Sequence, residues 1–209
     1  MSPEFWPEPV TRESFEFLSQ FASKYDILLI GGWAAWLWTG LHKSKDIDAV
    51  VGYGTLYGLK AEYRVDKNER LAKYEIRQEK FDVDLYLPKY SRLAIPAEDL
   101  LKDYRAKVRG FDAVTAEALL VLKQEAEINR RNTLKGRKDA IDIATLCLRA
   151  SVDWEKYAEM LQRYGKESLR KELIRVITFY PDDDLAYLGV DHQKFRKWKK
   201  TVTEKLKGI

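Results

Sequence analysis

Cysteine and histidine are scarce in this chain of 209 residues, and their scarcity excludes several kinds of site. The single cysteine, Cys147, rules out an internal disulfide and fits a reducing compartment. Because only His42 and His192 accompany it, we do not expect a zinc site. No stretch approaches the ~20 apolar residues of a membrane span, and the first residues, with Glu4 and Glu8, lack the pattern of a signal peptide. We therefore expect a cytoplasmic protein with no membrane partner.

Apolar and aromatic residues are plentiful, so the chain is able to bury a substantial core. Hydrophobic residues make up 45% of the sequence and aromatic residues 12%. The net charge is a mild +4, and the distribution of basic residues is more informative than their excess. They cluster from Arg130 to Lys138 and again from Lys194 to Lys207. Each cluster suits a polyanion, and ordinary solvated surface is the alternative for each.

The residue patterns divide the chain into an α/β half and a helical half, with no internal repeat. The first ten residues hold three prolines and predict an extended arm, followed by a helix from Thr11 to Tyr25. Ala106 to Arg109 predicts a last short strand, and beyond it the spacing is helical. The expected helices are 115–130, 137–150, 154–164, 167–179 and 192–207. We expect an α/β domain over residues 1–112 and a helical domain over residues 113–209.

The stretch Ile27–Val51 is the most informative part of the sequence. Four apolar residues, Ile27–Ile30, predict a buried strand, and Gly31 and Gly32 follow it before a short apolar helix. These two residues, which we call the glycine pair, let backbone amides approach a ligand at a helix N-terminus, where anions are favoured. Three tryptophans crowd that helix and are expected to pack in the core.

Two strands further along carry pairs of aspartates. Asp46 and Asp48 lie on one face of a predicted strand, roughly 7 Å apart along it, and this spacing suits shared divalent metals. An anion cradle beside such a pair predicts a site for a nucleoside triphosphate with Mg²⁺. The alternating segment Phe81–Pro88 is a half-buried strand with Asp82 and Asp84 on one face, and it pairs as a hairpin with the alternating segment before it. Either of these aspartates is able to supply a third carboxylate.

In this order, the glycine pair, Asp46-x-Asp48 and a later strand aspartate resemble the polymerase-beta-like nucleotidyltransferase superfamily. Within it the sequence is most similar to the nucleotidyltransferase component of abortive-infection type IV toxin–antitoxin systems. The likeness as a whole covers roughly residues 27–148, and the narrower match rests on four segments. They are Lys43-Ser44, Val83–Pro88, the helical segment Ala116–Lys123 and the segment Lys135–Ile143, which contains Lys138-Asp139 and Asp142.

The resemblance implies a small mixed sheet flanked by helices, followed by a C-terminal helical bundle. It favours Asp84 over Asp82, so that Asp46, Asp48 and Asp84 would be the catalytic residues and hold two Mg²⁺ ions. It also implies that a nucleoside triphosphate contacts the glycine pair and three further residues, Lys43, Ser44 and Lys138.

The expected reaction is transfer of a nucleoside monophosphate to a hydroxyl of an RNA, such as a tRNA. Two alternatives stay open at this point. One is transfer to a partner protein in a toxin–antitoxin pair, and the other is a nucleotide- or RNA-binding module without turnover. For Lys138, Asp139 and Asp142 the competing interpretation is ordinary charge on a helix surface.

Overall fold

The computed structural model describes residues 5–208. Its strands are β1 (Ile27–Ile30), β2 (Ile47–Val51), β3 (Asp66–Asn68), β4 (Lys73–Arg77), β5 (Asp82–Tyr86), β6 (Arg105–Val108) and β7 (Phe111–Val114). Its helices are α1 (Glu8–Lys24), α2 (Gly31–Thr39), α3 (Tyr53–Glu62), α4 (Ala97–Asp103), α5 (Ala116–Arg130), α6 (Leu134–Arg149), α7 (Trp154–Arg163), α8 (Ser168–Thr178), the 3-10 helix η1 (Asp182–Asp184), α9 (Leu185–Leu188) and α10 (His192–Gly208).

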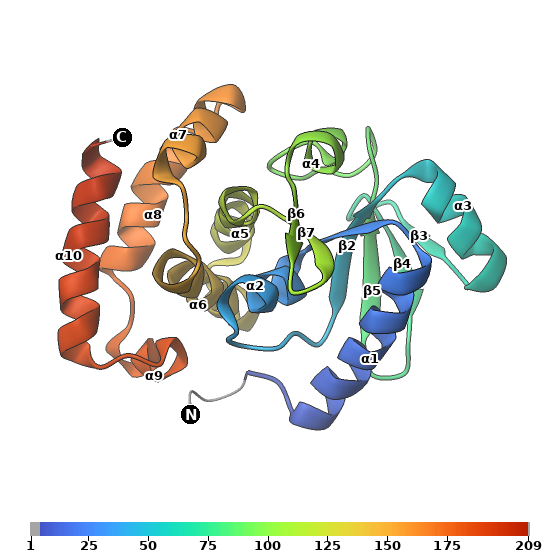
Figure 1. The fold of residues 1–209 in the computed structure, drawn as a ribbon, viewed down its shortest axis with the longest axis horizontal. Coiled ribbons are helices and arrows are strands. Elements are labelled where there is room, and N and C mark those ends of the chain that lie inside the picture. The colour runs from blue at the N-terminus through green and yellow to red at the C-terminus, as the bar shows by residue number, and fades with distance from the viewer. Residues whose placement is uncertain (1–4, 209) are drawn as a thin grey trace.

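The strands form one mixed sheet in the order β3-β4-β5-β2-β1-β7-β6. The pairs β2–β5 and β1–β7 are parallel, and the remaining neighbours are antiparallel. Figure 1 shows the sheet in one part of the molecule and α7, α8 and α10 at the end opposite to α3. A mixed sheet flanked by helices and followed by a helical half is the architecture that the sequence predicts, and it is confirmed.

Two strands and two helix starts differ from the sequence predictions, and one of these helices is α6, which begins at Leu134 instead of the expected position 137. The three residues of β3 are all polar, so no apolar alternation marks them, and β7 follows the β6 hairpin turn where we expected the chain to leave the sheet. The arm expected over residues 1–10 is wrong from Glu8 onward, because α1 begins there, after Pro7 at its N-cap. Residues 1–4 of that arm lie outside the described residues. The proposed domain boundary at residue 112 falls within β7 and stays a prediction.

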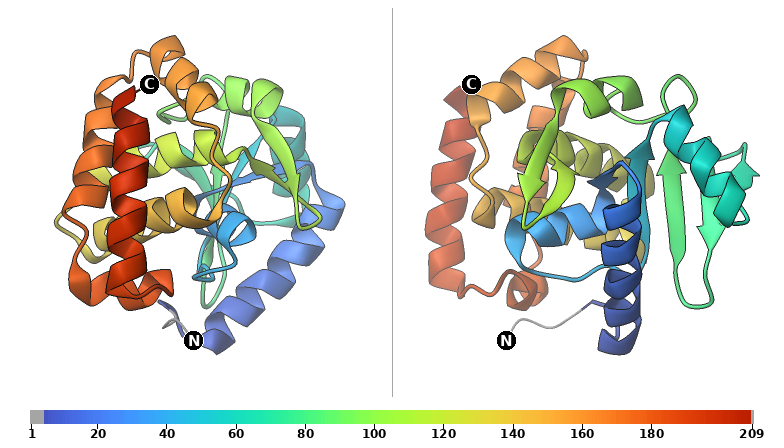
Figure 2. Two further views of the ribbon diagram at one scale, coloured as in Figure 1. Left: turned by 60° about the vertical axis from the view of Figure 1, so that its left-hand side comes forward. Right: turned by 45° about the vertical axis from the view of Figure 1, so that its right-hand side comes forward.

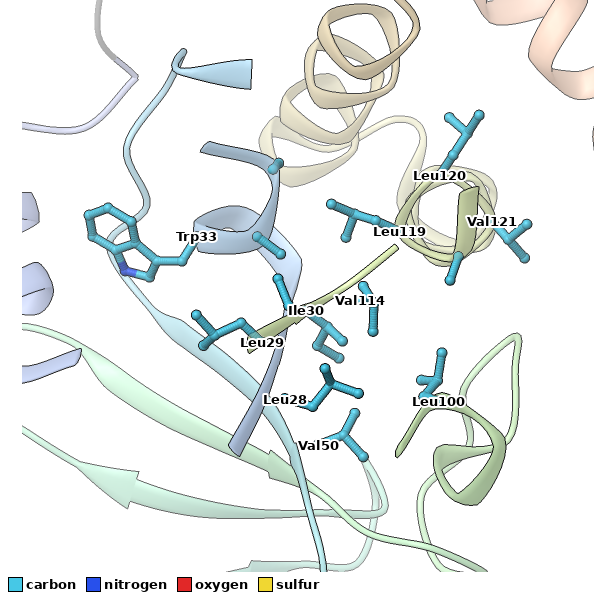
Figure 3. Close-up of a cluster of buried hydrophobic side chains, with 14 of the residues drawn as sticks. Leu28, Leu29, Ile30, Trp33, Val50, Leu100, Val114, Leu119, Leu120 and Val121 are labelled. Carbon is cyan, nitrogen blue, oxygen red and sulfur yellow. The ribbon is translucent and has the colours of Figure 1, made fainter. Parts of the chain in front are cut away.

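The core lies on both sides of β1. All four residues of β1 are buried. Figure 3 shows Leu28, Leu29 and Ile30 of β1 among apolar side chains of neighbouring elements, including Trp33 of α2, Val114 of β7 and Leu119 of α5. Trp33 of α2 is fully buried, and its Nε1 donates to Ser14 Oγ of α1 at 3.0 Å. Trp38 Nε1 donates to the Val114 carbonyl at 2.9 Å, so these tryptophans join elements of the core, as predicted.

The helical half packs on the α/β half through α5 and α6, which contact α2. These two helices also pack on each other, and α7 and α8 pack in turn on α5. In the two views of Figure 2, α10 lies along the outside of this helical half, beside α8. No helix within residues 5–208 combines the length and the apolar character needed to cross a bilayer.

Candidate active site

Three neighbouring strands bring the predicted site residues to one place in the sheet. Ile30, the last residue of β1, is the register partner of Asp48 on β2, and Asp48 is the register partner of Asp84 on β5. Gly31 follows Ile30 directly and begins α2. Asp46 lies one residue before β2. The glycine pair and the aspartates are therefore neighbours because β1, β2 and β5 are adjacent strands.

One cavity of about 410 Å³ unites most of these residues. It is lined by all of the predicted site residues except Lys43, namely Gly31, Gly32, Ser44, Asp46, Asp48, Asp84 and Lys138. Lys43 is half-buried in the loop between α2 and β2 and is not among the lining residues. The roles that the resemblance gives to these side chains stay predictions, and the structure supplies their arrangement.

The register between β2 and β5 distinguishes Asp84 from Asp82. Asp84 lies opposite Asp48 and lines the cavity, whereas Asp82 is exposed and is not among its lining residues. The backbone N–H of Asp82 instead donates to Asp46 Oδ1 at 3.2 Å. Asp82 therefore holds Asp46 through its main chain while its own carboxylate faces solvent.

The glycine pair is needed here because side chains from other elements approach its backbone. A Cβ on Gly31 would lie 2.2 Å from Asp48 Oδ2, and Gly31 also has a φ of +67°. A Cβ on Gly32 would lie 2.4 Å from Ser44 Oγ and 3.4 Å from Lys138 Nζ. Asp48, Ser44 and Lys138 thus surround the N-terminus of α2, where the first amides of a helix lack intrahelical partners.

Burial and like charge raise the pKa values of the two facing carboxyls. Burial raises the pKa of Asp48, and the positive charge of Lys123 opposes that effect. Burial, and after it the negative charge of Asp48, raises the pKa of Asp84 to about 6. Tyr86, two residues beyond Asp84 on β5, donates its hydroxyl to Asp48 Oδ1 at 3.3 Å. Burial and the charge of Asp48 also raise the pKa of that phenol well above its usual range.

Lys73 of β4 contacts Asp84 and is not among the site residues predicted from the sequence. Its Nζ lies 2.5 Å from Asp84 Oδ2 and 3.1 Å from Glu75 Oε1. Glu75 is the register partner of Asp84 across the β4–β5 pair, so the two carboxylates face each other with the ammonium between them. The second carboxylate oxygen, Asp84 Oδ1, is buried and has no hydrogen-bond partner within residues 5–208.

The donor chemistry at this edge of the cavity fits a hard divalent cation. Carboxylate oxygens are the ligands that Mg²⁺ prefers, and Asp46, Asp48 and the unpartnered Oδ1 of Asp84 supply them. Within the described residues, however, no three acidic, histidine or cysteine side chains are close enough together to hold one metal ion jointly. The fit therefore lies in the kind of ligand and in the orphaned oxygen, and not in a closed coordination sphere.

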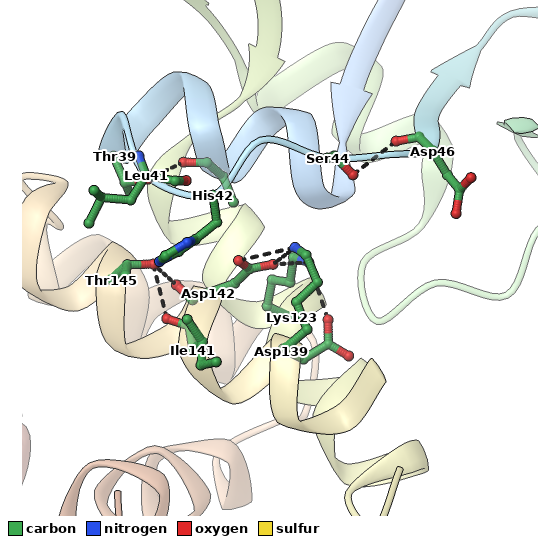
Figure 4. A network of polar contacts seen from close by, with 12 residues as sticks. Thr39, Leu41, His42, Ser44, Asp46, Lys123, Asp139, Ile141, Asp142 and Thr145 are labelled. Carbon is green, nitrogen blue, oxygen red and sulfur yellow. Dashed lines mark hydrogen bonds and ion pairs between the residues drawn. The ribbon is translucent and has the colours of Figure 1, made fainter. Parts of the chain in front are cut away.

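A buried ionic network lies beside the carboxylates, between α5 and α6. Figure 4 shows Lys123 of α5 between Asp139 and Asp142 of α6. Lys123 Nζ donates to Asp142 Oδ2 at 2.6 Å and to Asp139 Oδ1 at 3.2 Å, and Lys138 Nζ donates to Asp142 Oδ2 at 3.0 Å. Burial alone would lower the pKa of Lys123, but both aspartates outweigh it and raise that pKa. Because Asp139 and Asp142 are each only 1% exposed, the interpretation as helix-surface charge is wrong.

The basic cluster from Arg130 to Lys138 is largely neutralised by acidic partners. Arg130 Nε donates to Asp139 at 2.6 Å, and Arg131 pairs with Glu127 and Glu172. The partner of Arg137 is the buried Asp184 of η1, and that of Lys138 is Asp142. Four of the basic side chains that the sequence grouped as a polyanion site thus hold carboxylates of this same chain.

Several cavity-lining side chains were not selected from the sequence. Among them are Trp6, Lys73, Tyr86 and Lys123. The alternation of Lys73 with the apolar residues of β4 marked it as polar-facing, and Lys123 ended a helix that carried the family resemblance. Neither pattern identified the ion-pair partner of its lysine, because the partners are distant in the sequence. Asp84 lies 11 positions after Lys73, and Asp139 lies 16 positions after Lys123.

Comparisons with known proteins place this architecture. The sequence matches no protein-family model and no curated protein. An antigenic nucleotidyltransferase-like protein from Paracoccidioides brasiliensis superposes with a TM-score of 0.50 at 18% identity, covering 86% of this chain and 93% of its own. JHP933 from Helicobacter pylori superposes with a TM-score of 0.54 at 12% sequence identity, and the match covers 97% of this chain and 95% of JHP933. ANT(2")-Ia, in complex with adenylyl-2"-tobramycin, superposes with a TM-score of 0.50 at 13% sequence identity. The match covers 78% of this chain and 99% of ANT(2")-Ia. At these identities the likeness establishes the fold, and this chain has a nucleotidyltransferase fold.

Proposed function

We propose that this chain is a magnesium-dependent nucleotidyltransferase that moves a nucleoside monophosphate from a nucleoside triphosphate to a hydroxyl of an RNA acceptor. The observation that carries the proposal is the meeting of Asp46, Asp48 and Asp84 with the glycine pair around one cavity. Gathering like charges in a partly buried place is unfavourable unless a cation offsets them, so such clusters mark functional sites. Among structures of this fold, one neighbour was solved in complex with adenylyl-2"-tobramycin.

The triphosphate would lie at the N-terminus of α2. The absence of side chains at Gly31 and Gly32 lets Asp48, Ser44 and Lys138 lie close to the first amides of α2, and the helix dipole favours negative charge at this end. Lys138 lies beside Gly32 and would place its ammonium against the phosphates. Ser44, which also lies beside Gly32, would contribute a hydroxyl. Lys43 is the remaining predicted contact, and it would need to turn toward the cavity.

Asp46 and Asp48 would hold Mg²⁺, with Asp84 Oδ1 beside them. Mg²⁺, when bound, would neutralise charge on the phosphates and on the entering and leaving oxygens of an in-line displacement. Asp84 Oδ1 is buried without a partner and would accept the proton of the acceptor hydroxyl. The deprotonated acceptor oxygen, and not the carboxylate, would bond to the α-phosphorus while the bond to pyrophosphate breaks. A pKa of about 6 suits Asp84 to this task, because the carboxyl is then ionised at neutral pH but still basic.

The basic surface of α10 supports RNA as the acceptor. Its exposed basic side chains are Lys194, Arg196, Lys197, Lys200, Lys205 and Lys207. Phe195, Val202 and Leu206 bury the opposite face, so the charge is presented outward. The neutralised cluster from Arg130 to Lys138 gives RNA less support and favours the second candidate, a hydroxyl on a partner protein. The resemblance to the nucleotidyltransferase of toxin–antitoxin pairs makes a cognate protein the natural form of that candidate.

The test is to incubate the protein with each α-labelled nucleoside triphosphate, Mg²⁺ and total RNA or cell protein. Label in RNA is expected, and label in protein alone would select the second acceptor. Asp84→Asn should abolish incorporation, whereas Asp82→Asn should retain it, because Asp82 is exposed and does not line the cavity. Absence of label from both macromolecules with all nucleotides would contradict the proposal.

A further inference from the structure

Lys73 lies where a cation is expected beside the third carboxylate. Its ammonium bridges Asp84 Oδ2 and Glu75 Oε1, and its side chain is only 12% exposed. Glu75 is itself fixed, because Asn68 Nδ2 donates to its Oε1 at 2.8 Å and Arg77 lies 3.4 Å from its Oε2. Lys73 is thus held by Glu75 on its own strand β4 and by Asp84 on the neighbouring strand β5, and it also lines the cavity.

The same ammonium limits what Asp84 can do with a metal ion. One carboxylate oxygen already accepts a short, charge-assisted bond from Lys73, so a single oxygen, Oδ1, is left for any other cation. A divalent ion drawn to that oxygen would meet the positive charge of Lys73 across the width of one carboxylate. Such repulsion between like charges is strong in a partly buried place where water screens little.

We infer that Lys73 serves as a built-in cation at Asp84, so that this site takes one divalent ion at Asp46 and Asp48 plus a lysine ammonium. The sequence led us to expect two ions, and this inference replaces the second with a side chain. It rests on the proposed function for its place in nucleotidyl transfer. The ammonium then fixes the orientation of the Asp84 carboxylate and leaves Oδ1 as its one unpaired oxygen, which makes Lys73 a positioning residue.

Counting bound metal in the full-length protein tests the inference without any nucleotide. Metal-free wild type is titrated with Mn²⁺, and the free ion is measured by electron paramagnetic resonance. One site is expected in the wild type, none in Asp48→Asn, and two in Lys73→Met, where both oxygens of Asp84 are released. Arg77→Met is the matched control and should keep one site, because Arg77 shares the contact with Glu75 but is 71% exposed.

Thermal melting supplies a second readout. Lys73→Met leaves two carboxylates without their shared cation, so it should melt earlier than wild type in chelator, and Mn²⁺ should raise its Tm by more than it raises that of wild type or Arg77→Met. Two sites or none in the wild type would overturn the inference, even if Lys73→Met does not fold. So would an unchanged count in a folded Lys73→Met.

The metal count and the activity assay fail separately. A protein that binds one Mn²⁺ but labels no acceptor contradicts the proposed function and leaves the role of Lys73 intact. A protein that binds two Mn²⁺ ions and transfers nucleotide contradicts the role of Lys73 and leaves the proposed function intact.

Discussion

Gly31 and Asp48 approach so closely that a Cβ on Gly31 would lie 2.2 Å from Asp48 Oδ2. Two residues that are 17 positions apart in the chain are brought together because the last residue of β1 is in register with Asp48 on β2. The contact joins the start of α2 to the carboxylate that faces Asp84. The first prediction follows from it.

Gly31→Ala should abolish nucleotide transfer and lower the Tm. The left-handed backbone costs an alanine about 1–2 kcal/mol, and the new methyl group must also displace the Asp48 carboxylate. Gly165→Ala is the matched control, because Gly165 has a similar φ of +62° but open space around the missing Cβ. Thermal melting and label incorporation of both variants separate backbone strain from the clash. Equal losses in the two would show that the contact with Asp48 is unimportant.

Asp48→Asn should stop transfer while leaving the free protein at least as stable as wild type. Burial raises the pKa of Asp48, which means that its charge is unfavourable in the folded state, and Asp46 adds repulsion. The substitution should also lower the pKa of Asp84 from about 6, since the charge of Asp48 helps to raise it. Melting in chelator, incorporation in Mg²⁺ and an NMR titration of Asp84 measure the three effects. A large drop in Tm would indicate a structural role instead.

Asp84 should make stability fall as pH rises through about 6. Its pKa rises from the ordinary 3.8 to about 6 on folding, so the folded protein binds this proton more tightly than the unfolded chain. The stabilisation is complete below the unfolded value and is lost as pH passes the folded one, with a total on the order of 1–3 kcal/mol. Urea unfolding in chelator at pH 5 to 7.5 should show the decline in wild type and in Asp82→Asn. In Asp84→Asn this component should be absent.

Lys123→Met should destabilise the protein by about 3–5 kcal/mol, because it leaves Asp139 and Asp142 buried without their shared cation. Lys107→Met provides the comparison. Its pair with Asp112 is exposed at the lysine, so its loss should amount to about 0–1 kcal/mol. Adding Asp142→Asn to Lys123→Met should recover part of the stability. A small loss in Lys123→Met by urea unfolding would contradict the interpretation of the buried network.

RNA affinity should fall steeply with salt if α10 contacts the acceptor, with a log–log slope near −0.7 per phosphate contact on a single strand. Changing Lys197, Lys200 and Lys205 to Gln should flatten that slope by roughly two units. Lys199 is kept because its Nζ donates to the Thr178 carbonyl at 3.1 Å. The control removes the same charge elsewhere, at Lys89, Lys102 and Lys107. Identical slopes in both triple variants, measured by filter binding, would make α10 plain solvated surface.

Local sequence patterns were sufficient to place the first part of the site. A four-residue apolar strand, a glycine pair and alternation through Asp48 are properties of short segments, and each depends on the period of one element. For the same reason the hairpin of β4 with β5 was predictable. Pattern alone did not reveal β3, whose residues are all polar, because an edge strand needs hydrogen bonds from a neighbour more than it needs a buried face.

What only the tertiary structure decided is which side chains meet. Asp82 and Asp84 share a face in sequence, and the parallel register of β5 with β2 separates them by setting Asp84 opposite Asp48. The partners of Lys73 and Lys123 likewise depend on strand order and helix packing. Charge from Arg130 to Lys138 looked available in the sequence and is neutralised in the fold. The sequence by itself therefore determined most of the elements and the kinds of ligand they carry. Register and packing between distant segments determined the charge balance of the site, because pairing energies depend on distances that no local pattern encodes.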